Sequence, residues 1–283
     1  MTDSHHTALV SADWLKTHIG APDLRVVDAT WIPPFLVGRK SGDLLYKQAH
    51  IPGAVFFDID AVAARDSDMP HMLPDPVQFS SQVRKMGLGD GNRIVIYDTN
   101  GFFASARVWW MFRAMGHKDV MVLNGGLSAW QAVGGETEDL APPAAERHFT
   151  SRKRADLVRT RAQMHEVIGR ADTVILDARS QERFTGQAPE PRPDLPSGHM
   201  PGSINLPHTQ LLSADGRLKE PDALRHILAD YLDKSVIATC GSGVSAAIIA
   251  LALAHIGHWD TAIYDGAWTE WASHQDSPIL TNR

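Results

Sequence analysis

The sequence predicts an α/β protein made of two similar domains, each built on a small parallel sheet flanked by helices. Four observations predict this class. The chain has 283 residues, which is enough for two domains of ordinary size. A series of motifs occurs twice, and short β-branched runs alternate with helix-like stretches. With 43% hydrophobic residues, there is material for two cores.

The repeat is visible as five pairs of motifs at nearly constant spacing. LRVVDAT, which contains Asp28, returns as TVILDARS with Asp177, and HIPGAVFF from His50 returns as HMPGSINL from His199. Both pairs are 149 residues apart (177 minus 28; 199 minus 50), whereas RIVIYDTNG and SVIATCGSG, AMGH and HIGH, and NGGLSAW and DGAWTEW are 141 apart (236 minus 95 for the first of these). The first copy therefore carries extra residues, which are expected in RDSDMPHMLPDP.

The elements of each copy follow from its apolar runs. Strands are expected at 25–29, 93–98 and 120–124, and again at 173–178, 235–240 and 261–266. Helices are expected after the second strand of each set, in SARVWWMFRAMG and AAIIALALAHIG. Continuous apolar strands that lead into helices indicate a parallel sheet covered on both faces.

The domain limits are expected where periodicity is lost. Residues 1–140 form the N-terminal domain, which lacks the cysteine; 141–160 form a linker rich in proline and in both charge signs; 161–283 form the C-terminal domain. The basic residues between 152 and 161 are interpreted as a solvated face of this linker, since no aromatic residues are interleaved with them.

Charge and cysteine content narrow the function classes. Lys and Arg total 27 against 33 Asp and Glu, so the net charge of -6 argues against nucleic-acid and membrane-surface partners. A single cysteine cannot form an internal disulfide. The start, MTDSHHTALVSADW, lacks a basic region followed by an apolar one, and the most apolar run is far shorter than a membrane span of about 20 residues. A cytoplasmic protein is expected.

The single cysteine, Cys240, stands where a strand ends and a turn with two glycines leads into a helix. Backbone N–H groups of such a turn can face inward, and the helix adds its positive end, so a thiolate or an anion bonded to the sulfur is stabilised. A buried, inert thiol is the plain alternative. A cysteine phosphatase would need an arginine after the turn, where Ala246 and Ala247 stand. Sulfur transfer through a persulfide needs no such arginine, no cofactor and no metal.

The chain resembles the tandem-domain rhodanese sulfurtransferases, over nearly its whole length. LVSADWL, FFDID, HMLP, RVWWMFRAMGH, ERF, EPRPD, SGHMPG, CGSGV and YDGAWTEW carry the resemblance. The active loop separates two branches: mercaptopyruvate enzymes resemble CGSGV(T/S)A, whereas thiosulfate enzymes carry basic residues, as in CRKGV(T/S)A. Gly241 and Ser242 make this chain similar to the mercaptopyruvate branch, and Ser245 keeps the hydroxyl of the usual threonine. Two rhodanese-like domains are thus expected.

The resemblance implies a donor and its contacts. Arg183 and Arg192 would hold the carboxylate and ketone of 3-mercaptopyruvate. The loop residues would bind the persulfide through their N–H groups; they are Gly241, Gly243, Val244 and Ser245. From the residues alone, surface arginines in a proline-rich loop are the favoured interpretation, and the resemblance reverses that order.

The resemblance also implies a polar triad of Ser242, His71 and Asp60 near the cysteine, the last two from the first domain. Such a triad could relay a proton to the departing pyruvate enolate. The alternative is that His71 and Asp60 only brace the domain interface. His50 and His199 are expected to fix the turns of the two HxPG motifs, because they occur in both copies.

At a spacing of 141, Thr99 occupies the position of Cys240, so the first domain should not carry sulfur. The expected reaction moves sulfur from 3-mercaptopyruvate through a Cys240 persulfide to a thiol acceptor, such as thioredoxin or a small thiol, or to cyanide, and releases pyruvate. Two alternatives stay open: thiosulfate as the donor, and a persulfide carrier with little turnover.

Overall fold

A computed structural model describes residues 7–36, 38–143 and 145–281, so the first six residues of the MTDSHHTALVSADW segment lie outside the described part. The chain forms two compact units. Unit 1 comprises Met1–Ala64, Pro74–Arg154 and Ala214–Arg217; unit 2 comprises Arg65–Leu73, Ala155–Ser213 and Leu218–Arg283. The domain limits at 140 and 161 stay a prediction.

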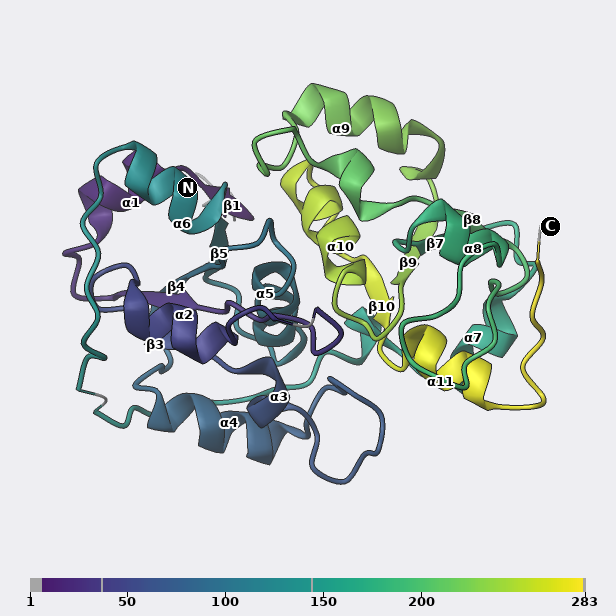
Figure 1. Ribbon diagram of the computed structural model, residues 1–283, viewed down its shortest axis with the longest axis horizontal. Coiled ribbons are helices and arrows are strands. Elements are labelled where there is room, and N and C mark those ends of the chain that lie inside the picture. Colours follow the sequence, from purple (N-terminus) through teal and green to yellow (C-terminus); the bar gives the residue numbers. More distant parts are fainter. Residues whose placement is uncertain (1–6, 37, 144, 282–283) are drawn as a thin grey trace, which may run out of the picture. The chain divides into compact units, whose positions relative to one another are not determined.

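Unit 1 is built on a five-stranded parallel sheet in the order β1-β5-β4-β2-β3. The strands are β1 (Leu9–Val10), β2 (Leu24–Asp28), β3 (Val55–Phe56), β4 (Arg93–Tyr97) and β5 (Val120–Leu123). Its helices flank this sheet (Figure 1) and are α1 (Ala12–His18), α2 (Gly42–Gln48), α3 (Ile59–Val62), α4 (Pro76–Lys85), α5 (Ser105–Ala114) and α6 (Gly126–Ala132).

Unit 2 repeats this plan with the order β6-β10-β9-β7-β8, again all parallel. The strands are β6 (Val158–Arg159), β7 (Thr173–Asp177), β8 (Ser203–Asn205), β9 (Ser235–Thr239) and β10 (Ala262–Tyr264). The helices are α7 (Arg161–Val167), α8 (Gln181–Thr185), α9 (Pro221–Leu228), α10 (Ala246–His255) and α11 (Ala267–Ser273), with 3-10 turns η1 (Ala155–Leu157), η2 (His208–Leu211) and η3 (Ala229–Tyr231).

The identical strand order of the two sheets confirms the predicted repeat and the parallel α/β class. In both units the strand before the longest apolar helix lies at the centre of its sheet, with β4 between β5 and β2 and β9 between β10 and β7. The following helix is buried along most of its length: α5 and α10 carry apolar residues on nearly every face. Within the described ranges, no helix is both long and apolar enough to cross a membrane.

The two HxPG histidines have the structural role expected from the repeat. His50 and His199 are buried, and their rings stack on Tyr46 and Phe184 with centroids 4.0 Å apart in both cases. Nδ1 of His50 lies 2.7 Å from the Tyr46 carbonyl oxygen, and Nδ1 of His199 lies 2.9 Å from that of Phe184. Each ring therefore ties its turn to the backbone of a preceding helix.

Candidate active site

Cys240 follows the last residue of β9, at the carboxyl end of the sheet of unit 2, and only 2% of it is exposed. The start of α11 holds the backbone of the turn. The Trp268 N–H donates to the Cys240 carbonyl (2.9 Å), and the N–H and Oγ1 of Thr269 donate to the Gly241 carbonyl (2.9 and 2.7 Å). In a trans peptide the C=O and the following N–H point in opposite directions. The N–H groups of Gly241 and Ser242 therefore face away from α11.

The two glycines of the turn serve different purposes. Gly243 has a φ of +77°, in the left-handed region that favours glycine. Gly241 allows a close approach instead: a Cβ at this position would lie 2.9 Å from Nη2 of Arg183, so the guanidinium would have to shift. Of these two glycines, only Gly243 has the left-handed backbone conformation.

The turn leaves backbone donors available for an anion. In the described part of the chain, the N–H groups of Gly241, Ser242, Val244 and Ser245 donate to no protein acceptor. The helix α10 begins directly after them and adds its positive end. Ser242 and Val244 are buried, and buried N–H groups without acceptors are rare in proteins, so this turn is suited to an anion at the cysteine.

Unit 1 contains the same turn, and its counterpart of Cys240 is Asp98 rather than Thr99. The strands β4 and β9 end immediately before Asp98 and Cys240. The N–H of Leu127, in the first turn of α6, donates to the Asp98 carbonyl (3.1 Å), as the Trp268 N–H donates to that of Cys240. The assignment of Thr99 from the spacing of 141 is wrong, because the turn of unit 1 is one residue longer before its helix begins.

The turn of unit 1 is closed around the Asp98 carboxylate. Oδ1 accepts from the N–H groups of Asn100 and Phe102 (both 3.2 Å), and Oδ2 accepts from those of Ala104 and Ser105 (3.1 and 2.8 Å). Asp98 is buried at the start of α5. This backbone geometry thus suits a negative charge on the side chain of the residue after the strand. In unit 2 that residue is Cys240, and the charge would lie on its sulfur.

We expect Asp98→Ala to lower the free energy of unfolding by about 3 kcal/mol, because four N–H groups, three of them buried, lose a charged acceptor at once. Urea denaturation followed by circular dichroism measures this. The matched control is Cys240→Ala, the same backbone position in unit 2, which should cost about 1 kcal/mol or less. Equal losses in the two variants would show that the Asp98 carboxylate does not hold its turn together.

Arg183, in α8, lies beside the cysteine turn and is oriented by Glu190. Its Nε donates to Oε1 of Glu190 (3.2 Å) and its Nη2 to Oε2 (2.5 Å). The Glu190 side chain is 3% exposed, whereas that of Arg183 is 24% exposed. The approach of Arg183 to Gly241 places a guanidinium next to the turn, as the sequence predicts; its role toward a substrate stays a prediction.

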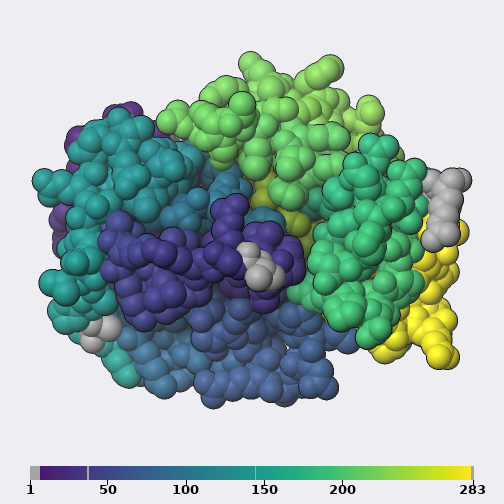
Figure 2. Space-filling view, in the orientation of Figure 1, coloured from purple at the N-terminus to yellow at the C-terminus, as the bar shows by residue number. Residues whose placement is uncertain are grey.

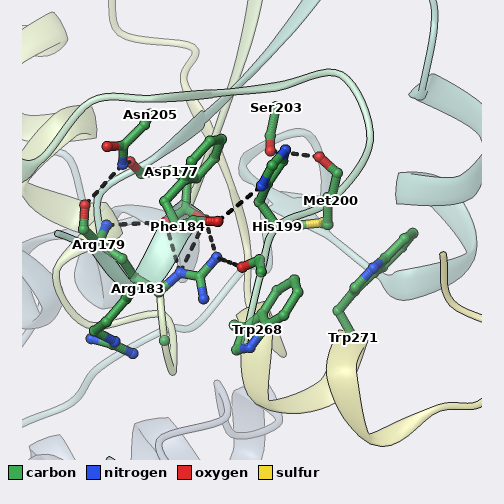
Figure 3. Close-up of polar contacts among 12 residues, drawn as sticks. Asp177, Arg179, Arg183, Phe184, His199, Met200, Ser203, Asn205, Trp268 and Trp271 are labelled. Atoms are coloured by element: carbon green, nitrogen blue, oxygen red, sulfur yellow. Dashed lines mark hydrogen bonds and ion pairs between the residues drawn. The ribbon is translucent and has the colours of Figure 1, made fainter. Parts of the chain in front are cut away.

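Behind this pair lies a second, fully buried ion pair between Arg179 and Asp177 (0% exposed for both side chains). Figure 3 shows the Arg179 guanidinium between Asp177 and the ring of Trp268, whose centroid is 4.3 Å away. Arg179 also donates to Oε1 of Glu190 (2.9 Å) and to the Gly198 carbonyl (2.8 Å). Burial by itself would lower the pKa of Arg179, but the carboxylates of Asp177 and Glu190 raise it above its ordinary value.

His208 approaches Arg183 from the start of η2. Burial lowers the pKa of His208, the Ala178 carbonyl 3.1 Å from Nδ1 acts against this, and the positive charge of Arg183 lowers it further. The imidazole is therefore mostly neutral at pH 7, and Arg183 supplies the positive charge here.

The remaining predicted residues are placed as follows. Ser242 is buried in the turn itself, and Arg192 is half-buried on the segment between α8 and β8. The green surface of unit 2 in Figure 2 includes this segment. The expectation that His71 comes from the first domain is wrong, because the segment Arg65–Leu73 packs with unit 2; His71 is buried there with a φ of 62°. Asp60 belongs to unit 1, in α3, where its Oδ2 accepts from Nε1 of Trp31 (2.7 Å). The triad of these groups stays a prediction.

Two residues of this site were missed by the sequence reasoning, Arg179 and Glu190. Both lie in motifs that were recognised, DARS and EPRPD, but acidic and basic residues are common in loops and carry no periodic signal. The available signal was the acidic residue two positions before Arg192, in a segment expected to bind an anion, where an uncompensated carboxylate would be unfavourable.

The chain is similar to known proteins over nearly its whole length. A family model described as the rhodanese-like domain matches residues 11–133 and 160–274. The chain is 38% identical to the 3-mercaptopyruvate sulfurtransferase of Escherichia coli K12, over 96% of this chain and 98% of that protein. It is also 38% identical to the thiosulfate sulfurtransferase of Rattus norvegicus, over 94% and 92%. The crystal structure of SseA from Escherichia coli, a 3-mercaptopyruvate sulfotransferase, matches with a TM-score of 0.84 at 36% identity, covering 93% of this chain and 99% of that one.

Proposed function

Since the chain belongs to the rhodanese-like domain family, with two copies of the domain, we propose that it is a sulfurtransferase that uses 3-mercaptopyruvate as its donor and Cys240 as its sulfur carrier. The observation that carries this proposal is the pairing of unused N–H donors at the Cys240 turn with the guanidinium of Arg183 beside Gly241. The N–H donors suit an anionic sulfur, and the guanidinium suits a carboxylate at the other end of a short substrate.

The first half-reaction forms the persulfide. The Cys240 thiolate attacks the sulfur of 3-mercaptopyruvate, an S–S bond forms and the C–S bond of the substrate breaks. The electron pair of that bond leaves with the pyruvate enolate, which takes a proton to become pyruvate. The N–H groups that face away from α11 stabilise the charge on the outer sulfur, as the counterpart turn stabilises the carboxylate of Asp98.

The substrate is held by the two arginines. Arg183 grips the carboxylate, and Arg192 the ketone or the second carboxylate oxygen. Ser242 and His71, which both lie in unit 2 with Cys240, would supply the proton that the enolate takes, and the part of Asp60 stays a prediction. That Ser242 is buried in the turn and that His71 folds with unit 2 support this assignment.

The second half-reaction discharges the sulfur. A thiolate acceptor, from thioredoxin or a small thiol, attacks the outer sulfur of the persulfide, and Cys240 leaves as thiolate; cyanide would accept the same atom as thiocyanate. The expected place of this reaction is the cytoplasm, which fractionation of cells would test.

Thiosulfate is the second candidate donor, because the relative named for it is as similar as the mercaptopyruvate enzyme. The neutral turn favours 3-mercaptopyruvate. Its only charged neighbour among the contacts described above is Arg183, which occupies the space that a side chain at position 241 would need. A basic residue at position 241, as in CRKGV, would displace that guanidinium and place its own charge near the sulfur of the substrate.

We expect pyruvate release from 3-mercaptopyruvate with a kcat/KM at least about tenfold above that of thiocyanate formation from thiosulfate and cyanide. In the absence of an acceptor, mass spectrometry should find one added sulfur atom on the peptide that contains Cys240. The control is the same protein alkylated at its single cysteine. A preference for thiosulfate would overturn the donor, and persulfide without turnover of either donor would favour a carrier.

A further inference from the structure

Glu190 bridges the two arginines of the site. Its Oε1 accepts from Nη1 of Arg179 (2.9 Å) and from Nε of Arg183 (3.2 Å), and its Oε2 accepts from Nη2 of Arg183 (2.5 Å). Its side chain is almost fully buried. A carboxylate in this position costs desolvation energy and is retained only because its partners are good, so its contacts define what it does.

The way Glu190 binds Arg183 decides which donors remain for a ligand. A guanidinium has five N–H donors in a planar fork. Glu190 takes the side edge, formed by Nε and Nη2, and so leaves the end edge, formed by Nη1 and the second hydrogen of Nη2. That edge can bind another carboxylate through two parallel hydrogen bonds. The Nη2 atom that belongs to both edges is the one that lies against Gly241.

Arg179, unlike Arg183, has almost no donor left for a ligand. Its Nε and Nη2 donate to Asp177, its Nη2 also to the Gly198 carbonyl and its Nη1 to Glu190, so at least four of its five donors are used. With its side chain fully buried, it has no edge for a substrate. Its place is to anchor Glu190.

The charges of this group cancel. Asp177 and Glu190 carry two negative charges, and Arg179 and Arg183 carry two positive ones. A neutral group that presents one oriented guanidinium edge suits a substrate with a single carboxylate. A small dianion without a carboxylate gains less binding energy from this neutral group, because the attraction of an anion grows with the net positive charge of the site.

Resting on the proposed function, we infer that Glu190 is a positioning residue that sets donor specificity: it turns the end edge of Arg183 toward the Cys240 turn and removes the excess positive charge that would favour thiosulfate.

The test is Glu190→Gln, which keeps the size of the side chain and removes its charge. We expect the KM for 3-mercaptopyruvate to rise about tenfold with kcat changed by less than about threefold, since orientation of the substrate carboxylate is lost. The kcat/KM for thiosulfate should stay constant or rise. The ratio of the two specificity constants therefore falls at least about tenfold.

A second variant separates charge from orientation. Glu190→Asp keeps the charge but is too short to reach both arginines, so the 3-mercaptopyruvate KM should rise while thiosulfate turnover does not improve. The matched control is Asp172→Asn, because Asp172 forms a similar two-point pair with Arg170 (3.1 and 2.9 Å) on the exposed surface of the same unit. Both specificity constants of this control should equal those of the parent.

The outcomes are distinct. If the parent prefers 3-mercaptopyruvate and Glu190→Gln lowers both specificity constants in parallel, Glu190 is only structural and this inference is overturned, while the proposed function stands. An unchanged ratio of the two constants overturns the inference in the same way. If the parent turns over neither donor, the proposed function fails and the inference fails with it. Circular dichroism and thermal unfolding establish that each variant is folded.

Discussion

Replacing Cys240 by alanine is expected to abolish sulfur transfer from either donor, with a loss of at least about 10³-fold in kcat. Every covalent step of the proposed reaction uses this sulfur, and the chain has no other cysteine to replace it. Pyruvate release and thiocyanate formation measure the loss. The N–H donors of the turn stay in place in the variant, but without a thiolate they have no nucleophile to stabilise.

Cys240→Ser is the sharper form of this experiment. The hydroxyl is close in size to the thiol but is not ionised near pH 7, so activity should be lost equally while the fold is kept. Thermal unfolding of both variants should stay close to that of the parent, because a buried side chain of this size contributes little packing energy. Activity above about 1% of the parent in either variant would exclude Cys240 as the sulfur carrier.

The second large effect is expected for Arg183→Ala, which should lower kcat/KM for 3-mercaptopyruvate about 100-fold, mainly through KM. The variant removes the guanidinium beside Gly241 and leaves the buried Glu190 with Arg179 alone. Removing a bidentate, partly desolvated partner of a carboxylate typically costs about 2–5 kcal/mol of binding free energy. A 100-fold effect lies in the lower part of that range.

Arg183→Lys tests the geometry of this contact. Lysine restores the charge but not the fork that binds Glu190 and a second carboxylate at once, so only a small part of the activity should return. The control is Arg170→Ala, which removes an exposed arginine of the same unit and should leave both KM and kcat unchanged. Unchanged kinetics in Arg183→Ala would remove the carboxylate clamp from the proposed mechanism.

The relation between the two arginines shows why such a site needs more than one charged residue. Arg179 uses its donors to hold Glu190, Glu190 uses its carboxylate to orient Arg183, and Arg183 keeps one edge for a ligand. Truncating either anchor should therefore affect substrate affinity without touching the cysteine. This is the expected behaviour of residues that hold a binding group within a few tenths of an ångström of its working position.

Much of the fold could be predicted from the sequence because it depends on local patterns. Val- and Ile-rich runs form strands and apolar helical stretches cover them, and the double occurrence of the motifs leads to two sheets with the same strand order. The position of Cys240, at the end of a central strand and before a buried helix, follows from the same patterns. Residues that are neighbours in the chain encode these features, so the features can be recognised without the tertiary structure.

Only the tertiary structure decided the features that depend on residues distant in the chain. That Asp98, and not Thr99, is the counterpart of Cys240 emerged from the backbone contacts of α6 and α11, because one added residue in a turn leaves the motif spacing almost unchanged. The bridge made by Glu190 required β7, α8 and the following segment to fold together, since which charges meet is set by chain reversals and not by composition. By itself the sequence thus determined the fold and the cysteine turn, and the folded chain determined how that turn is charged and oriented.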